Sequence, residues 1–152
     1  MDQGSVDCAA VLNKSPDGWT EAIGLRYVTA TGDRAAAELE ISSQHLKPDG
    51  SVDEAIYGGL VEAVASVGAA LYAMRWRRPV VGIENQTSFL RTVRSGRLLV
   101  SATPLQRDYE TQVWEGHVTD SNGQVVATGR MRLICLEEDA GLRSPVLDSI
   151  DM

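Results

Sequence analysis

One segment of this sequence has the spacing of a single long helix. Its apolar side chains recur every three or four positions, at Ile56, Leu60, Val64, Val67, Leu71 and Met74. The pattern Ser51-Val52-Asp53-Glu54 is that of a capping box, so we expect the helix to start near Ser51, and Pro79 closes the segment. A lone helix with one apolar stripe is stable only when that stripe packs against another layer.

The segments on both sides of the helix have the alternation of strands and supply that layer. Strands are expected at 25–28, 35–42, 80–90, 97–105, 112–119 and 125–136, with hairpin turns at 31–34 and 120–123 and a short helical turn at 19–23. The order of two strands, one helix and four strands in a meander predicts a two-layer α+β domain.

The boundaries of this domain follow from where the periodicity stops. Residues 1–15 show no clear period and are expected to form a flexible N-terminal arm. The single domain would cover 16–136. Residues 137–152 are acidic and aperiodic, so we expect a disordered tail.

Composition excludes several classes of partner and site. The formal net charge of −7 disfavours nucleic acid, and no apolar run approaches the roughly 20 residues that a membrane span needs, so we expect neither partner. His45 and His117 are isolated, and Cys8 and Cys135 show no metal-ligand spacing. We therefore expect no metal, cofactor or disulfide framework, and a reducing cytoplasm as the location.

The face of the helix nearly opposite the apolar stripe carries small residues and one carboxylate. The carboxylate is Glu62, and its neighbours on that face are Ala55, Gly58, Gly59, Ala65, Ser66 and Ala69. Such a face lets a second surface approach the helix closely. A single acid in that setting is a candidate functional group.

Two stretches after the helix, VVGIENQTSFLRTVRSGRL and QVWEGHVTDSNGQVVATGRMRL, resemble hotdog-fold thioesterases. The similarity is to the PaaI-like and 4-hydroxybenzoyl-CoA-thioesterase-like branch, and it covers roughly residues 19–136. The resemblance implies a long central helix wrapped by a curved antiparallel sheet. It also implies an acyl-CoA substrate and a homodimer, or a homotetramer built from two dimers, with the small-residue helix face toward the partner subunit.

The family's G-x-x-H-G-G signature, followed by an acid seven residues after the second Gly, fits this sequence in two registers. One register matches Tyr57-Gly58-Gly59 and leaves Ser66 at the acid position. The other matches Asp53-Glu54-Ala55 and places Glu62 at the acid position, with Gly50 as the upstream glycine. We favour the second register because it agrees with the expected helix start and needs no gap.

In this register the resemblance implies a role for each residue around the thioester. Glu62 would act as nucleophile or general base, Ser66 would orient water, and the backbone N–H of Glu54 would bind the developing oxyanion. Asp53 replaces the family His and adds negative charge near that oxyanion. Lys47 stands where the family often has Gln or Asn, and is either a cation near the carbonyl or a partner of Asp53.

The segment after the helix supplies candidate substrate-binding residues. Asn85 and Thr87 belong to the family-like run, and Arg91, Arg94 and Arg97 lie where related enzymes place basic groups toward the CoA phosphates. Because the H-G-G residues are replaced, the alternative is a non-catalytic hotdog protein that binds an acyl-CoA or acyl-carrier thioester. A dehydratase or isomerase is disfavoured because it would want a His beside the acid.

Overall fold

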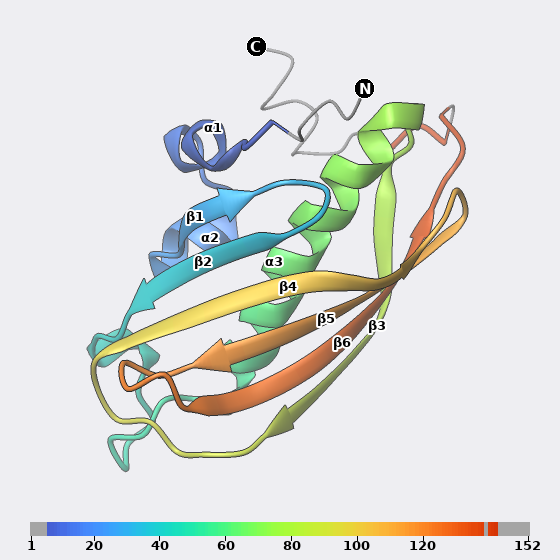
Figure 1. Cartoon of the computed structure of the whole chain (residues 1–152). Helices are drawn as coiled ribbons and strands as arrows, with labels where there is room; N and C mark the ends of the chain where they lie inside the picture. The colour runs from blue at the N-terminus through green and yellow to red at the C-terminus, as the bar shows by residue number, and fades with distance from the viewer. Residues whose placement is uncertain (1–5, 139, 143–152) are drawn as a thin grey trace.

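The chain forms a six-stranded antiparallel sheet wrapped around one long helix, α3 (Glu54–Ala73), in a computed structural model that describes residues 6–138 and 140–142 (Figure 1). The strands are β1 (Arg26–Ala30), β2 (Ala35–Glu40), β3 (Val80–Phe89), β4 (Arg97–Arg107), β5 (Thr111–Thr119) and β6 (Val125–Cys135). Two short helices, α1 (Ala9–Lys14) and α2 (Gly18–Ile23), precede β1, and 3-10 turns occur at Ser43–His45 and Met74–Trp76. The expected α+β class and two-layer arrangement are confirmed.

The strand order, β1-β2-β4-β5-β6-β3, differs from the expected four-strand meander. β3 pairs with β6 at one edge of the sheet, and β4 pairs with β2. The loop between β3 and β4 instead passes the start of α3, where the Val52 N–H donates to the Val93 carbonyl at 2.8 Å. Alternation identifies strands but not their neighbours, because a loop of this length permits either a hairpin or a crossing.

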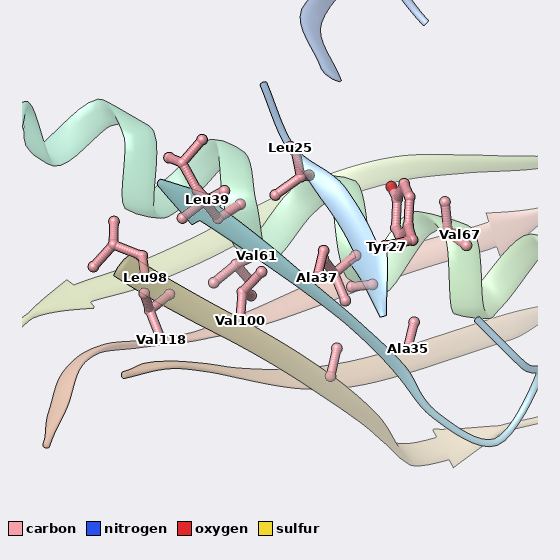
Figure 2. Packing of buried hydrophobic residues seen from close by; sticks show 14 of the residues in the cluster. Leu25, Tyr27, Ala35, Ala37, Leu39, Val61, Val67, Leu98, Val100 and Val118 are labelled. Carbon is pink, nitrogen blue, oxygen red and sulfur yellow. The ribbon is translucent and has the colours of Figure 1, made fainter. Parts of the chain in front are cut away.

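The sheet buries a wider part of α3 than the predicted stripe. Leu60, Val64 and Val67 are buried as expected, whereas Ile56, Leu71 and Met74 are only half-buried. Ala65 and Ala69 were assigned to the opposite face, yet both are fully buried. Both residues are buried because the curved sheet encloses more of the helix than one stripe. Leu39, Val100 and Val118 point from the sheet toward the helix in Figure 2.

Helix α3 and its extension are long and apolar enough to cross a membrane, by length and composition alone. The helix and its 3-10 extension, Glu54–Trp76, have a mean hydropathy of 1.4 over the most apolar window, and half of that window is buried within the fold. Burial against six strands accounts for the apolar composition, because a central helix enclosed by a sheet needs apolar side chains on most of its surface.

The N-terminal segment is not a loose arm over its described part, which begins at residue 6. Residues 9–14 form α1, and the Asp7 carboxylate anchors it by accepting from Thr29 Oγ1 at 2.6 Å and from the Ala30 N–H at 2.9 Å. Local periodicity could not reveal this anchoring, because it depends on contacts with β1. Residues 1–5 lie outside the described part of the chain.

The expected acidic tail also begins with defined contacts. Buried Arg78 donates to the Cys135 and Leu136 carbonyls at 2.8 and 2.7 Å and to Glu137 at 3.0 Å. The prediction of disorder for the rest of the tail concerns residue 139 and residues 143–152, which lie outside the described residues.

Candidate active site

Glu62 lies in the middle of α3 with its side chain exposed, and Ser66 follows one helical turn later. The Ser66 hydroxyl donates to Glu62 Oε1 at 3.0 Å. Positions i and i+4 of a helix lie on the same face, so the sequence spacing alone brings these two groups together. The hydroxyl fixes the direction of the carboxylate and leaves its other oxygen available for a further hydrogen bond.

A cleft of about 290 Å³ opens beside Glu62 and Ser66. We call it the catalytic cleft, after the role predicted for Glu62. Its walls come from α2, β1, α3 and the start of β3, and its lining residues are Asp17, Trp19, Thr20, Tyr27, Glu62, Ala63, Ser66, Val67, Ala70, Val80 and Gly82. The cleft therefore combines one carboxylate-hydroxyl pair with apolar and aromatic walls. Pockets for small organic molecules usually have this composition.

Tyr27 is a buried tyrosine in the lining of this cleft. Burial raises the pKa of its phenol well above the usual range, and the carboxylates of Asp17 and Glu62 raise it further. The Tyr27 hydroxyl therefore stays protonated near neutral pH, and it donates a long hydrogen bond of 3.4 Å to the Ala63 carbonyl.

Helix α3 begins at Glu54 with Asp53 as its N-cap, so the expected start near Ser51 is too early in the sequence. Asp53 Oδ1 accepts from the Ala55 N–H at 3.0 Å. Ser51 is unavailable as a cap because its hydroxyl and its N–H both donate to Asp49 Oδ1, at 2.6 and 2.9 Å. The capping-box pattern therefore predicts the N-cap two residues too early, at Ser51 instead of Asp53.

Lys47 pairs with Glu54, with 2.9 Å between Nζ and Oε1, so the alternative in which it pairs with Asp53 is not observed. The hydrogen bond from Lys47 lowers the pKa of the Glu54 carboxyl, and the same bond raises the pKa of Lys47. The pair thus stays charged at neutral pH. Lys47 offsets part of the negative charge that Asp53 and Glu54 bring to the helix N-terminus.

Asn85 and Thr87 connect β3 to the first turns of α3. Asn85 Nδ2 donates to the Gly58 carbonyl at 2.9 Å, and Thr87 Oγ1 donates to Asn85 Oδ1 at 2.7 Å. Both side chains are thus near the predicted site, but their observed partner is the helix. Substrate binding by these two residues stays a prediction.

The three predicted CoA-binding arginines do not share one location. Arg94 donates to the Asp49 carbonyl at 2.6 Å, beside the entrance to α3. Arg97 is paired with Glu38 and Glu40 on β2, at 3.4 and 3.3 Å. Arg91, which precedes both in the sequence, is exposed. The described geometry therefore leaves Arg91 and Arg94 as the better candidates for phosphate contacts.

Sequence reasoning missed the contribution of Trp19, Tyr27 and Asp17 to the cleft. The Trp19 ring lies directly against Gly59, where an added Cβ would collide with it. The glycine pair in the helix was a signal that some surface approaches closely. For Gly59, that surface is supplied by the same chain. As for metals, the described residues contain no group of three or more His, Cys, Asp and Glu side chains arranged to hold an ion.

Comparison with known proteins identifies the family. Residues 50–127, which contain α3 and most of the sheet, match the model of the thioesterase superfamily. The chain belongs to this superfamily. Its structure is the hotdog fold of the superfamily, as the resemblance implied.

Relatives in the superfamily are named as esterases and hydrolases. "Putative esterase Rv1847" of Mycobacterium tuberculosis is 34% identical over 137 residues, which cover 89% of this chain and 97% of that protein. A solved structure of that esterase has a TM-score of 0.77 at 32% identity and covers 83% of this chain and 98% of the other.

A second group of relatives carries a more specific name. The 1,4-dihydroxy-2-naphthoyl-CoA hydrolase of Listeria monocytogenes is 27% identical over 113 residues, covering 74% of this chain and 91% of that protein. The solved structure of AziG from S. sahachiroi has a TM-score of 0.74 at 33% identity and covers 80% and 98% of the two chains. Together, the family and these names support thioester hydrolase chemistry for this chain.

Proposed function

We propose that this protein is an acyl-CoA thioesterase whose site is shared between two protomers. Glu62 of one protomer would act on a thioester whose carbonyl oxygen is held by the α3 N-terminus of the other. The observation that carries the proposal is the exposed Glu62 carboxylate, oriented by Ser66 at the mouth of a cleft in a thioesterase-superfamily chain.

The distance between Glu54 and Glu62 along α3 is the reason for proposing a second protomer. Glu54 and Glu62 are eight residues apart, so they are separated by about 12 Å along the α3 axis. The bond to Ser66 also turns the Glu62 carboxylate toward the C-terminal end, away from Glu54. A general base and an oxyanion donor must both lie within about 3 Å of the reacting groups. One chain cannot meet both distances at one carbonyl, whereas a symmetric pair can.

The free edge of the sheet offers a surface for such a pair. β3 is ten residues long, lies at the edge, and exposes most of its side chains, with Ile83 53% exposed. Pairing of β3 with its symmetry-related copy would satisfy its open backbone groups and bring the two α3 helices alongside each other in opposite directions. This supports a homodimer, and a homotetramer could be built from two dimers.

Two chemical routes fit the position of Glu62. As a general base, the carboxylate removes a proton from water while the water oxygen attacks the carbonyl carbon. The C–S bond then breaks, and the thiolate takes up the proton. As a nucleophile, the carboxylate forms an anhydride with the acyl group and expels the thiolate, and water then hydrolyses the anhydride.

The CoA part of the substrate is proposed from the relatives' names together with the cleft and the exposed arginines. A chain with a net charge of −7 repels anions at long range, so local cations are needed to bind the CoA phosphates. Arg91 and Arg94 lie in the loop after β3 and can supply them. A cytoplasmic location, where CoA thioesters and reduced cysteines coexist, stays a prediction.

One observation favours the second candidate function, a module that binds an acyl-CoA or acyl-carrier thioester without hydrolysing it. Asp53 Oδ1 accepts a hydrogen bond from the Ala55 N–H at 3.0 Å, so its negative charge lies close to where an oxyanion would develop. A negative charge there opposes the transition state but does not oppose binding of a neutral thioester.

Release of free thiol from short, medium and aromatic acyl-CoAs tests the proposal and separates the two functions. We expect turnover in the wild type and a loss of roughly a hundredfold or more in kcat/KM for Glu62→Gln, because the base or nucleophile is removed. Glu110→Gln, a matched change in the turn between β4 and β5, should retain turnover. Equal turnover in wild type and Glu62→Gln would reject the catalytic assignment, and binding without turnover in the wild type would favour the binding module.

A further inference from the structure

Trp19 separates the catalytic cleft from a second cleft at the start of α3. The second cleft, the terminal cleft below, has a volume of about 250 Å³ and is lined by Trp19, Ala22, Ile23, Gln44, His45, Asp53, Ala55 and Ile56. Trp19 is the one residue that appears in both linings. The two clefts thus lie on either side of a single aromatic side chain.

The position of the ring on α3 explains the separation. Trp19 covers Gly59, which lies between Ala55 of the terminal cleft and Glu62 of the catalytic cleft. Residues four apart on a helix are adjacent on its surface, so positions 55, 59 and 63 form one row. Because Gly59 has no Cβ, the indole ring can lie directly against the helix backbone and close the groove.

The backbone at Trp19 is fixed by hydrogen bonds at both ends of α2, although the residue is 41% exposed. Asp17 Oδ1 caps α2 by accepting from the Thr20 N–H at 2.9 Å. At the other end, His45 Nε2 lies 2.8 Å from the Ile23 carbonyl, and Gly24 ends the helix with φ of 76°. The barrier is therefore one side chain on a well-anchored helix, and a change to that side chain can open it.

We propose that Trp19 is a specificity-determining residue that limits the length of the acyl group. The acyl chain lies in the catalytic cleft beside Glu62 and ends against the indole ring. Val67, Ala70 and Val80 are apolar side chains of the cleft on the Glu62 side of the ring, and Ile23 and Ile56 are apolar side chains of the cleft on its other side. This inference rests on the proposed function, because it takes the catalytic cleft to be the acyl site.

The volumes of the two clefts are consistent with a barrier that limits the length of the acyl group. The catalytic cleft is at the lower limit of the range of roughly 300–1,000 Å³ that is usual for small-molecule sites, and the terminal cleft is smaller. The two joined would lie inside that range. Removal of the ring should therefore admit acyl groups that extend past Gly59 toward the α3 N-terminus, with hydrocarbon in contact with apolar side chains on both sides.

The experiment uses Trp19→Ala, Gly59→Ala and the double variant, with straight-chain acyl-CoAs from acetyl to palmitoyl. The readouts are kcat/KM and, with non-hydrolysable S-alkyl-CoA thioethers, Kd. We expect Trp19→Ala to raise the long-chain to short-chain ratio by about tenfold or more in both readouts. Gly59→Ala should shift the ratio in the same direction, because its new Cβ displaces the ring. In the Trp19→Ala background the Gly59 change should have no further effect.

Leu105→Ala is the control, because it removes an exposed apolar side chain of β4 that lines neither cleft. It should leave the long-chain to short-chain ratio unchanged. Turnover with an unchanged ratio in Trp19→Ala would overturn the inference and leave the proposed function standing. Absent turnover with a shifted ratio of Kd values would overturn the proposed function and support the inference. A Gly59→Ala effect that persists without Trp19, or no thioether binding by any variant, would overturn the inference.

Discussion

The Asp53 carboxylate lies at the N-terminus of α3, where we propose that negative charge develops on the thioester oxygen. It stabilises the fold by capping α3, with 3.0 Å between Oδ1 and the Ala55 nitrogen. In the proposed reaction it would also repel an oxyanion at the neighbouring N–H groups. These two effects can be separated, because Asn caps a helix about as well as Asp but carries no charge.

Asp53→Asn should therefore raise kcat/KM on the best acyl-CoA while leaving the melting temperature nearly unchanged. We expect an increase of roughly fivefold, which corresponds to about 1 kcal/mol for a solvent-screened charge at close range. Asp120→Asn, in the turn between β5 and β6, is the matched control and should change neither quantity. A large loss of activity at unchanged stability would instead make Asp53 a participant in the reaction.

At the level of residues, helical period was enough to predict some parts of the site. Glu62 and Ser66 share a face because they are four positions apart, and the structure joins them by a hydrogen bond. Trp19 and Tyr27 could not be placed in this way. They reach the cleft from α2 and β1, and how these elements pack on α3 is decided by the tertiary fold.

Among the elements, α1 and β1 are joined by the Asp7 carboxylate and by the Asn13 side chain, which bonds to both the N–H and the carbonyl of Tyr27 at 2.8 Å. Asp7 accepts from the Thr29 hydroxyl and from the backbone N–H groups of Ala9 and Ala30. The hydrogen bond from Thr29 is the largest cause of a lowered Asp7 pKa. Burial opposes this effect, and the two backbone hydrogen bonds lower the pKa further. A carboxyl whose pKa is lower in the folded state stabilises the fold only while it is ionised.

Asp7→Ala should destabilise the protein near pH 7 by about 1 kcal/mol, or roughly 2–4 °C in melting temperature. Because the folded-state pKa is depressed, this stabilisation is present above the unfolded-state pKa of about 4 and is lost as pH falls through the lower folded-state value. The difference between wild type and Asp7→Ala should therefore narrow in thermal melts below about pH 4. Glu110→Ala is the control, and a difference that stays constant with pH would contradict this role of Asp7.

Turn chemistry predicted the hairpins, and tertiary contacts decided the remaining connections. Asp120-Ser121-Asn122-Gly123 joins β5 to β6 as expected, with Gly123 at φ of 77°. The pairing of β3 with β6 was not predictable from alternation, because each strand has the same two-residue period whichever neighbour it has. The start of α3 was misplaced because Asp49 captures Ser51, a contact that the capping-box pattern does not include.

For the whole molecule, assembly and catalysis are two aspects of one proposal. β3 is the long open edge, whereas β1 at the other edge has five residues and carries α1 beside it. Association through β3 would place the Glu62 of one protomer near the α3 N-terminus of its partner. We therefore expect two sites per dimer, each built from both chains.

The most direct test mixes two inactive variants that are defective in different halves of the site. Glu62→Gln removes the carboxylate, and Glu54→Pro removes the backbone N–H at the first helical position. Proline is well tolerated there, and Asp53 already has the extended conformation, with φ of −63° and ψ of 124°, that a residue before proline requires. Glu54→Gln, which keeps the N–H, is the control for loss of the side chain.

Each variant alone should hydrolyse acyl-CoA poorly. After subunit exchange in an equimolar mixture, half of the dimers are mixed, and each mixed dimer has one intact site. The account predicts recovery of about one quarter of wild-type kcat/KM per protomer, because a two-fold dimer with shared sites pairs the two intact halves once. Mixed dimers that form, as shown by mass spectrometry, but remain as inactive as the separate variants would contradict the shared site.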